Sequence, residues 1–474
     1  ANSPASQSYT EEQRRTCESL LHEFERDGIH LPSDKREAVV ALNTDIAHLS
    51  MEFMKNMTHG VEMFEVTDAS ALSVLPMELL GNLPKQPDSL PKNAVLLPAE
   101  THVLPLFARV AAHPCSPRAI TNAILSLVGS GEVRKQAFMA AQTVNAGNLT
   151  VLSQLVQKRQ EMAAVTGFQS FAHYATVERM VGSPEVAMEF LLDLVDKVRP
   201  AAEEELNILR KIKQVTEGNS DIHAWDVQYY QSKHMSRSPL VSASTSRKYY
   251  SLDNVMNGLG RLVDSLFGVA LVEVEMEAGE AWAGPAGHVR KFVLQDKEEG
   301  ALGVIYLDLL ARKNKFSGAA HFVVRCGRQL HHFETGEHSS TKPKFQLPIV
   351  ALVTSFAPHS YLLSPADVDT LFHEFGHALH SLLSRTEFQH LSGTRGPLDF
   401  VEFPSHLFEM FASDYRVVSS FARHVRVTTA DTLPESMFRS IRQVVNAFPA
   451  IELQTQIVRA MFDQVLFGAP PPPG

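Results

Sequence analysis

Hydrophobic residues in the first half of the chain recur every three or four positions, which is the spacing of amphipathic α-helices. This spacing predicts helices within residues 9–59, 133–168 and 183–215. Between the first two, residues 76–117 hold eight prolines, and such a segment cannot form long helices. The first half is therefore predicted to be helical, with an irregular proline-rich connector.

Three shorter runs further along the chain have the composition of β-strands. Residues 303–310, 320–327 and 346–356 are rich in β-branched or aromatic residues and are bounded by turn-forming residues. Together they predict a small β-sheet.

A helix is predicted directly after these strands. Ser364 suits the N-cap, Pro365 suits the first helical position, and the hydrophobic periodicity continues to about Leu383. Further helices are predicted within residues 404–421 and 433–467. The predicted fold class is therefore mainly α, with a small β-sheet beside the helix that begins after Ser364.

Composition narrows the class of protein. With 474 residues, 44% of them hydrophobic and 20% charged, the chain has ample material for a large soluble globular protein of two or three lobes. Its formal charge of −10 and its scattered basic residues argue against nucleic acid as a partner. No apolar run approaches the roughly 18 residues of a membrane helix, so no membrane partner is expected.

The three cysteines, Cys17, Cys115 and Cys326, lie far apart without paired spacing. They are predicted to be free thiols in a reducing compartment. The sequence starts at Ala1 without an initiator methionine, so we expect any targeting peptide to lie upstream.

The predicted helix after Ser364 carries the sequence LFHEFGHALHSLL. Residues four apart share one helical face, so His373 and His377 can direct both imidazoles at one metal ion. A catalytic zinc takes three protein ligands and lowers the pKa of its water to roughly 7. Glu374 follows the first ligand, where its carboxylate can accept the proton of that water. The implied reaction is peptide-bond hydrolysis.

The third zinc ligand is predicted to be Glu402, 25 residues beyond His377. Another class of zinc peptidases uses a histidine ten residues after the first, but position 383 is leucine. Three other acidic residues compete by residue type, namely Glu387, Asp399 and Glu409.

These competitors are expected to play other parts. Glu387 follows the helix too closely to fold back onto it. Asp399 and Glu409 remain candidates for orienting the imidazoles through hydrogen bonds.

An ordinary buried helix that happens to carry histidines is the alternative interpretation. Against it, a buried Glu374 between two histidines is costly unless it has a purpose or a partner. Gly376 costs about 1 kcal/mol relative to alanine within a helix, which suggests that another segment approaches closely there. His380 lies too far along the axis from His373 to share its ion, so a structural or substrate-contacting role is expected. The metal interpretation is favoured.

The stretch from His373 to Glu402, HEFGHALHSLLSRTEFQHLSGTRGPLDFVE, resembles the thimet oligopeptidase family of zinc metallopeptidases, including its SGT turn and DFVE segment. The resemblance continues through EGALGVIYLDLL at 299–310 and FASDYRVVSSFARH at 411–424. It covers roughly residues 165–467 well and the N-terminal helices more loosely.

The resemblance implies that His373, His377 and Glu402 bind one Zn²⁺ per chain and that Glu374 is the general base. It also implies a two-lobed helical ellipsoid with a deep channel. The flanking segments are most similar to mitochondrial members of the family, which remove an N-terminal octapeptide from imported precursors in the matrix. The expected substrate is therefore a peptide or a precursor protein, the expected location is the mitochondrial matrix, and the expected state is a monomer.

Residues 1–150 are accordingly predicted to form an N-terminal helical region with the proline-rich connector, and residues 151–474 a catalytic domain that is incomplete at its C-terminal end. Family members continue past the position of Gly474 with a Gly- and Tyr-rich segment whose tyrosines stabilise the oxyanion, and this sequence contains no such segment. Loss of one such donor typically costs about a hundredfold or more in rate. We therefore expect this chain to bind metal but to hydrolyse peptides poorly.

Two alternative functions remain open. One is a general organellar or cytosolic oligopeptidase that degrades short peptides, and the other is a truncated peptide-binding form with weak catalysis. The metal used in the cell is also open, because a His/His/Glu set accepts manganese, cobalt or iron as well as zinc.

Overall fold

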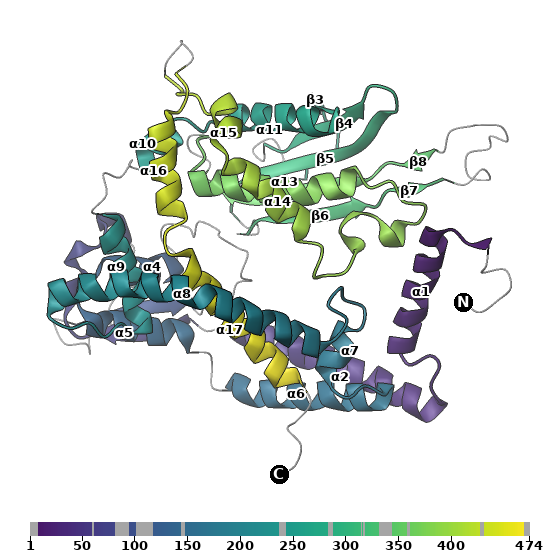
Figure 1. Cartoon of the computed structure of the whole chain (residues 1–474), viewed down its shortest axis with the longest axis horizontal. Helices are drawn as coiled ribbons and strands as arrows, with labels where there is room; N and C mark the ends of the chain where they lie inside the picture. The colour runs from purple at the N-terminus through teal and green to yellow at the C-terminus, as the bar shows by residue number, and fades with distance from the viewer. Residues whose placement is uncertain are drawn as a thin grey trace. The chain divides into compact units, whose positions relative to one another are not determined.

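The computed structural model describes residues 8–58, 61–80, 94–100, 117–143, 147–236, 243–282, 288–313, 315, 318–330, 344–357, 361–426 and 431–468. The chain divides into two compact units. The sheet unit comprises Ala1–His22, Ala108–Ala111 and Val241–Val445, and the helical unit comprises Glu23–Phe107, Ala112–Leu240 and Asn446–Gly474. Helices dominate the chain and a small sheet accompanies them, as predicted (Figure 1). The channel and the domain boundary at residue 150 stay predictions.

The helical unit is built mainly from paired helices. Its elements are α2 (Ser33–Thr58), β1 (Val61–Val66), α3 (Met77–Leu80), β2 (Val95–Glu100), α4 (Pro117–Leu127), α5 (Gly131–Gln142), α6 (Gly147–Thr166), α7 (Phe171–Thr176), α8 (Pro184–Glu217), α9 (Ala224–Met235) and α17 (Pro449–Phe467). α2 packs along α6, α17 packs along α8, and β1 pairs with β2 in a two-stranded antiparallel sheet. Most of the predicted connector at 76–117 lies outside the described residues.

A buried ionic cluster joins three helices of this unit. Asp226 of α9 accepts a hydrogen bond from Arg134 Nη2 of α5 at 2.5 Å and another from Lys213 Nζ of α8 at 2.7 Å. Burial alone would raise the pKa of Asp226, but these two donors lower it below its ordinary value. The three helices are therefore held together by charge as well as by hydrophobic contact.

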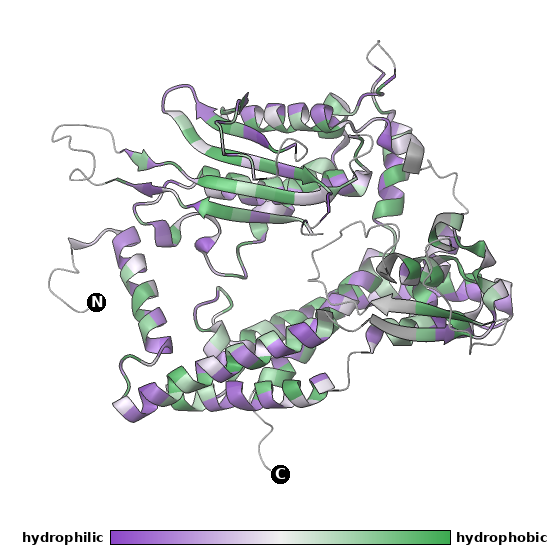
Figure 2. Cartoon of the chain, turned by 180° about the vertical axis from the view of Figure 1, so that it is seen from behind, coloured by the Kyte–Doolittle hydropathy of each residue, from purple (hydrophilic) through white to green (hydrophobic). Residues whose placement is uncertain are grey.

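The sheet unit contains a five-stranded sheet in the order β3-β4-β5-β9-β6. Its strands are β3 (Ala270–Val274), β4 (Arg290–Asp296), β5 (Gly300–Leu310), β6 (Ala320–Arg325) and β9 (Ile349–Phe356), and β7 (Arg328–Gln329) pairs with β8 (Phe345–Gln346). Only the central pair, β5 and β9, is parallel. The three predicted strand runs correspond to β5, β6 and β9, and Figure 2 shows hydrophobic stretches along the central strands of this sheet. β3 and β4 are not among the predicted strands.

Helices accompany the strands of this unit. They are α10 (Ala243–Arg247), α11 (Leu252–Phe267), α13 (Pro365–Leu382), α14 (Phe403–Ala412), α15 (Tyr415–Phe421) and α16 (Glu435–Val445), while α1 (Glu11–Arg26) crosses from this unit into the helical unit along the sequence. Helices lie within residues 404–421 and 433–467, as predicted, and each of these segments contains two helices. Between α16 and α17, Phe448 takes a left-handed φ of 60° directly before Pro449.

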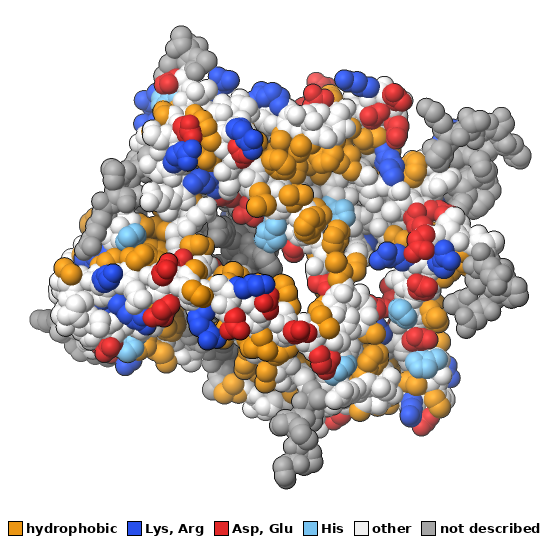
Figure 3. All heavy atoms as spheres, viewed as in Figure 1, with side chains coloured by type: hydrophobic (Ala, Val, Ile, Leu, Met, Phe, Trp, Pro, Cys, Tyr) orange, Lys and Arg blue, Asp and Glu red, His pale blue; other side chains and the backbone are white. Residues whose placement is uncertain are grey.

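Other surface and thiol features complete the fold. Among the described helices, none combines the length and hydrophobicity needed to cross a membrane. Acidic and basic side chains are interspersed over the face shown in Figure 3. Cys17 and Cys326 are free thiols, as predicted, and Cys115 lies outside the described residues.

Helix α13 is the centre of the sheet unit's core. It contacts β5, β6 and β9 of the sheet, and Leu371, Phe372, Phe375 and Leu382 are fully or almost fully buried. A helix that is hydrophobic on several faces must be covered on several faces. The sheet covers one side of α13, and α14 covers another.

The crossing of α14 over α13 is closest at Gly376. A Cβ atom placed on Gly376 would lie 2.7 Å from the carbonyl oxygen of Pro404, 2.7 Å from Ser405 Cα and 2.9 Å from Phe408 Cβ. The close approach that the sequence predicted at this glycine is thus present, and the approaching segment is the start of α14.

Gly376→Ala is expected to lower the free energy of unfolding by about 1–3 kcal/mol, because the new methyl group would press on backbone atoms of α14. Gly260 is the matched control, since it lies within α11 and an added Cβ would meet nothing within 4 Å. Gly260→Ala is expected to raise the free energy of unfolding by up to about 1 kcal/mol through helix propensity alone. Urea unfolding of both variants and of the parent chain measures these changes in the free energy of unfolding. Equal effects would contradict the close crossing.

Candidate metal centre

The first turn of α13 is fixed by a capping box. Ser364 Oγ accepts a hydrogen bond from the Asp367 N–H at 3.1 Å, and an Asp367 carboxylate oxygen accepts one from the Ser364 N–H at 2.7 Å. Two turns later the imidazoles of His373 and His377 lie side by side, with ring centroids 5.1 Å apart and planes at 85°. The helix therefore presents both rings to one point, as the four-residue spacing predicts.

Glu402 brings its carboxylate to the same point from the residue before α14. Its Oε2 lies 3.3 Å from His373 Nε2 and 3.1 Å from His377 Nε2. The hydroxyl of Ser405 shares its proton between this oxygen at 2.9 Å and the main-chain carbonyl oxygen of Glu402 at 2.8 Å. The structure thus brings together all three residues that the sequence singled out as ligands.

The distances from Glu402 Oε2 to the two imidazole nitrogens fit a tetrahedral metal ion. Ligands that bind zinc at about 2.0–2.1 Å in tetrahedral geometry are separated from each other by about 3.3–3.4 Å. The two distances from Glu402 Oε2, 3.3 and 3.1 Å, are close to that separation. Two imidazole nitrogens and one carboxylate oxygen are also the donor set of a known class of catalytic zinc sites.

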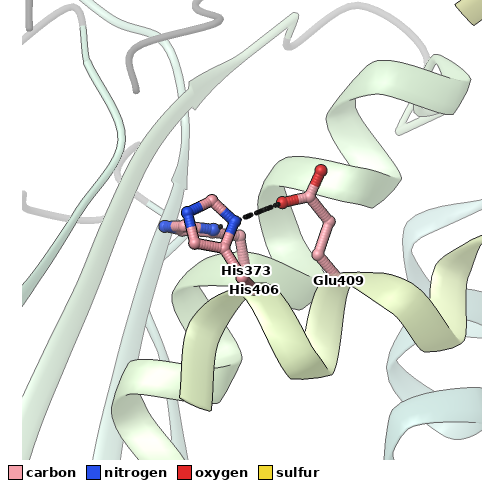
Figure 4. Close-up of side chains that lie close together, drawn as sticks. All are labelled: His373, His406 and Glu409. Carbon is pink, nitrogen blue, oxygen red and sulfur yellow. Dashed lines mark ion pairs between the residues drawn. The ribbon is translucent and has the colours of Figure 1, made fainter. Parts of the chain in front are cut away.

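A carboxylate on α14 contacts the back of the first histidine. Glu409 Oε2 lies 3.4 Å from His373 Nδ1 and 3.4 Å from His406 Nδ1, and Figure 4 shows the three side chains converging from α13 and α14. Hydrogen bonds from His373 and His406 lower the pKa of Glu409 to about 2. Glu409 was a sequence candidate for orienting an imidazole, whereas His406 was not singled out.

The other two acidic competitors lie elsewhere. Glu387 accepts a hydrogen bond from Gln13 Nε2 of α1 at 2.9 Å. Among the described residues, Asp399 belongs to neither of the groups whose donor atoms lie within 4.8 Å of one another. Those groups are His373 with His377 and Glu402, and His373 with His406 and Glu409.

The two groups use opposite nitrogens of His373, so they do not exclude each other. His373 Nε2 faces Glu402, and His373 Nδ1 faces Glu409. A metal-bound histidine commonly donates its second N–H to a carboxylate in this way. Glu409 and His406 therefore lie at the nitrogen of His373 that faces away from Glu402.

Glu374 is buried beside the two histidines. Burial raises the pKa of its carboxyl group to about 7, against the lowering effect of His373 and of a hydrogen bond from the backbone N–H of His321. A carboxylate whose pKa lies near neutrality is well matched to accepting and returning a proton.

Strand β6 adds a histidine that the sequence analysis missed. His321 has its ring centroid 6.0 Å from that of His377, and burial lowers the pKa of His321 to about 3. Burial likewise lowers the pKa of His377 to about 4. His380 is next along the helix, and its ring meets Phe400 edge-on at 6.1 Å.

One turn before His373, Asp369 anchors α13 to α16. Arg442 donates two hydrogen bonds to its carboxylate, at 2.7 and 2.8 Å, and a third to the carbonyl oxygen of Ala412 at the end of α14. This bidentate pair is almost completely buried, so solvent and salt weaken its attraction only slightly. It fixes α13 and α14 relative to each other a short distance from the histidines.

Comparison with known proteins decides the family. The family model described as "Peptidase family M3" matches residues 125–472, well over half of the chain. The chain belongs to peptidase family M3. Members of this family are metallopeptidases. A metal ion is therefore expected in this chain, and His373, His377 and Glu402 form a group that could hold one.

Curated relatives within this M3 family match almost the whole chain. Mitochondrial intermediate peptidase of Arabidopsis thaliana is 35% identical over 468 residues, covering 98% of this chain and 63% of the relative. Its namesakes in Pongo abelii and Yarrowia lipolytica are each 32% identical, covering 97% of this chain and 58% of the relative. These relatives confirm the likeness predicted from the flanking segments and support a mitochondrial localisation. The chain spans about 60% of their length.

A solved structure also matches this M3 chain. It is described as a putative oligoendopeptidase F from Bacillus anthracis, is 15% identical, and aligns with a TM-score of 0.31 over 96% of this chain and 74% of its own. A similarity this low does not bear on the details of the site.

The two candidate groups around His373 make different predictions for metal binding. His377→Ala removes a proposed ligand and is expected to weaken zinc binding by more than about 100-fold, beyond the range typical of residues that only orient ligands. His406→Ala removes a partner of Glu409 and is expected to weaken zinc binding by less than about tenfold. Zinc content after dialysis and competition with a chromophoric chelator measure both. A larger loss in His406→Ala would place the ion in the other group.

Proposed function

We propose that this chain holds one Zn²⁺ through His373, His377 and Glu402 and that it hydrolyses peptide bonds with Glu374 as the general base. The observation that carries the proposal is the position of Glu402 Oε2, which lies 3.3 and 3.1 Å from the two Nε2 atoms. When bound, a zinc ion polarises a water molecule and the carbonyl group of the substrate.

The residues of the chain then have separate tasks. Glu374 accepts the proton of the attacking water and passes it to the amine that leaves, a transfer suited to its pKa of about 7. Ser405 holds the carboxylate of Glu402, and Glu409 holds the ring of His373. The covering of α13 by the sheet and α14 keeps Glu374 in a poorly hydrated environment, where its charge acts more strongly.

The proposed substrates are imported precursor proteins, from which an N-terminal octapeptide is removed in the mitochondrial matrix by a monomeric enzyme. Two findings support this choice. The sequence resembles the mitochondrial members of the family, and the curated relatives carry the name mitochondrial intermediate peptidase. A general oligopeptidase is the second candidate, because the metal centre itself does not discriminate between a precursor and a short peptide.

Glu374→Gln is expected to lower the rate of peptide cleavage by about 10²–10⁴-fold, because an amide cannot accept the proton of the water. Zinc content is expected to stay at the level of the parent chain, since Glu374 is not a proposed ligand. Single-turnover cleavage of a quenched octapeptide with enzyme in excess measures the rate. Unchanged cleavage by this variant would remove Glu374 from its proposed role.

Cleavage assays with different substrates, together with a measurement of peptide affinity, separate the three functional hypotheses. Cleavage of precursor intermediates in preference to random short peptides supports the processing function, and the reverse preference supports a general oligopeptidase. Equal peptide affinity in the parent and in Glu374→Gln, with cleavage in neither, supports a peptide-binding protein.

A further inference from the structure

The two histidines of the motif are supported unequally by the side chains around them. His373 has a partner at each ring nitrogen, with Glu402 at Nε2 and Glu409 at Nδ1. His377 has Glu402 at Nε2, but its Nδ1 is buried and has no hydrogen-bond partner within the described part of the chain. A buried polar nitrogen without a partner costs about 1–3 kcal/mol, so this atom calls for a partner.

The ring beside His377 on the sheet side is that of His321. Their centroids are 6.0 Å apart and their planes are inclined by 30°. The Nε2 atom of His321 is also buried and also lacks a hydrogen-bond partner among the described residues. Two unpaired nitrogens therefore lie on adjoining rings, one on α13 and the other on β6.

The position of β6 fixes which way His321 points. The next residue along the strand, Phe322, is 49% exposed, whereas His321 is partly buried and its Nε2 atom is buried. Side chains alternate between the two faces of a strand, although exposure alternates less strictly at an edge such as β6. The contact with His377 places His321 on the α13 side.

We propose that His321 is a positioning residue for the metal ligand His377, with its Nε2 accepting a hydrogen bond from His377 Nδ1 after a small rotation of the two adjoining rings, whose nitrogens do not bond to each other in this structure. The inference rests on the proposed function, because a metal ion on His377 Nε2 leaves the proton of the neutral ring on Nδ1. A neutral imidazole has one donor and one acceptor nitrogen, so His321 can supply the acceptor. The pair would fix the tautomer and the ring orientation of His377, as Glu409 does for His373.

The side chain of His321 can be replaced without removing the contact that its backbone makes with Glu374. Its N–H donates to Glu374, and a substitution of the side chain leaves that bond in place. His321→Phe keeps an aromatic ring but removes the acceptor. His321→Gln places an amide oxygen close to the position of Nε2 and restores it.

Zinc affinity of the full 474-residue chain, measured by competition with a chromophoric chelator, is the main readout. His321→Phe is expected to bind zinc 10–100-fold more weakly than the parent, the range typical for partners of metal ligands. His321→Gln is expected to bind close to the parent value. The visible spectrum of the Co²⁺-loaded protein is expected to change in His321→Phe and to be restored in His321→Gln, because it reports ligand orientation.

His380→Phe is the matched control. His380 is also a half-buried histidine with an unpaired Nδ1, and it lies close enough to His321 and His377 to affect the pKa of each. Its ring packs against Phe400, so the variant tests the loss of a neighbouring imidazole that is not the proposed partner. We expect its zinc affinity to stay close to that of the parent. If His321→Phe does not fold, as judged by circular dichroism, His321→Leu replaces it in the same comparison.

Three results would overturn the inference. They are an unchanged affinity in the apolar variant, an equal loss in His321→Gln, and an equal loss in His380→Phe. Failure of the parent chain to bind zinc is a different result, because it would overturn the proposed function and not the pairing alone.

Discussion

The site depends on how closely α14 crosses α13. The crossing point is Gly376, where a side chain would meet the backbone of Pro404 and Ser405 at 2.7 Å. Ser405 also donates its hydroxyl to Glu402 Oε2 at 2.9 Å. The residue that touches the glycine is thus the residue that holds the third proposed ligand. Close backbone packing and ligand placement are therefore one constraint, and it explains why a glycine is used within a buried helix despite its cost in helix propensity.

Charge in the site is arranged around the same crossing. Glu374, Glu402 and Glu409 all lie near His373, and burial raises the pKa of Glu374 while it opposes the charged form of the histidine rings. Buried carboxylates and imidazoles in such numbers are costly unless charges of opposite sign compensate them. A divalent cation between His373, His377 and Glu402 would supply that compensation, and Glu409 would balance the polarised ring behind it.

Much of the fold could be predicted from local pattern, and the errors have physical causes. Helical periodicity located α8 and α13 well, because both are long and have recognisable N-caps at Ser183 and Ser364. β3 and β4 were missed because both strands mix charged with hydrophobic residues and are only partly buried. The break between α16 and α17 coincides with Pro449, a local signal that the sequence analysis did not use, whereas the left-handed φ of Phe448 before it is not evident from the sequence.

The residues of the site also differ in whether local sequence or long-range contacts determine their positions. The positions of His373, Glu374 and His377 follow from helix geometry. Glu402 was predicted because its spacing from His377 along the chain matches the class of zinc peptidases that uses a glutamate as third ligand. His321 could not be predicted, because its place beside His377 depends on the pairing of β6 with β9, in which His321 opposes Leu352. A shift of that register by one residue would turn His321 away from α13 and would also move its N–H from Glu374. The edge strand therefore contacts the proposed general base through its backbone and a proposed ligand through its side chain, and both contacts rest on one long-range register.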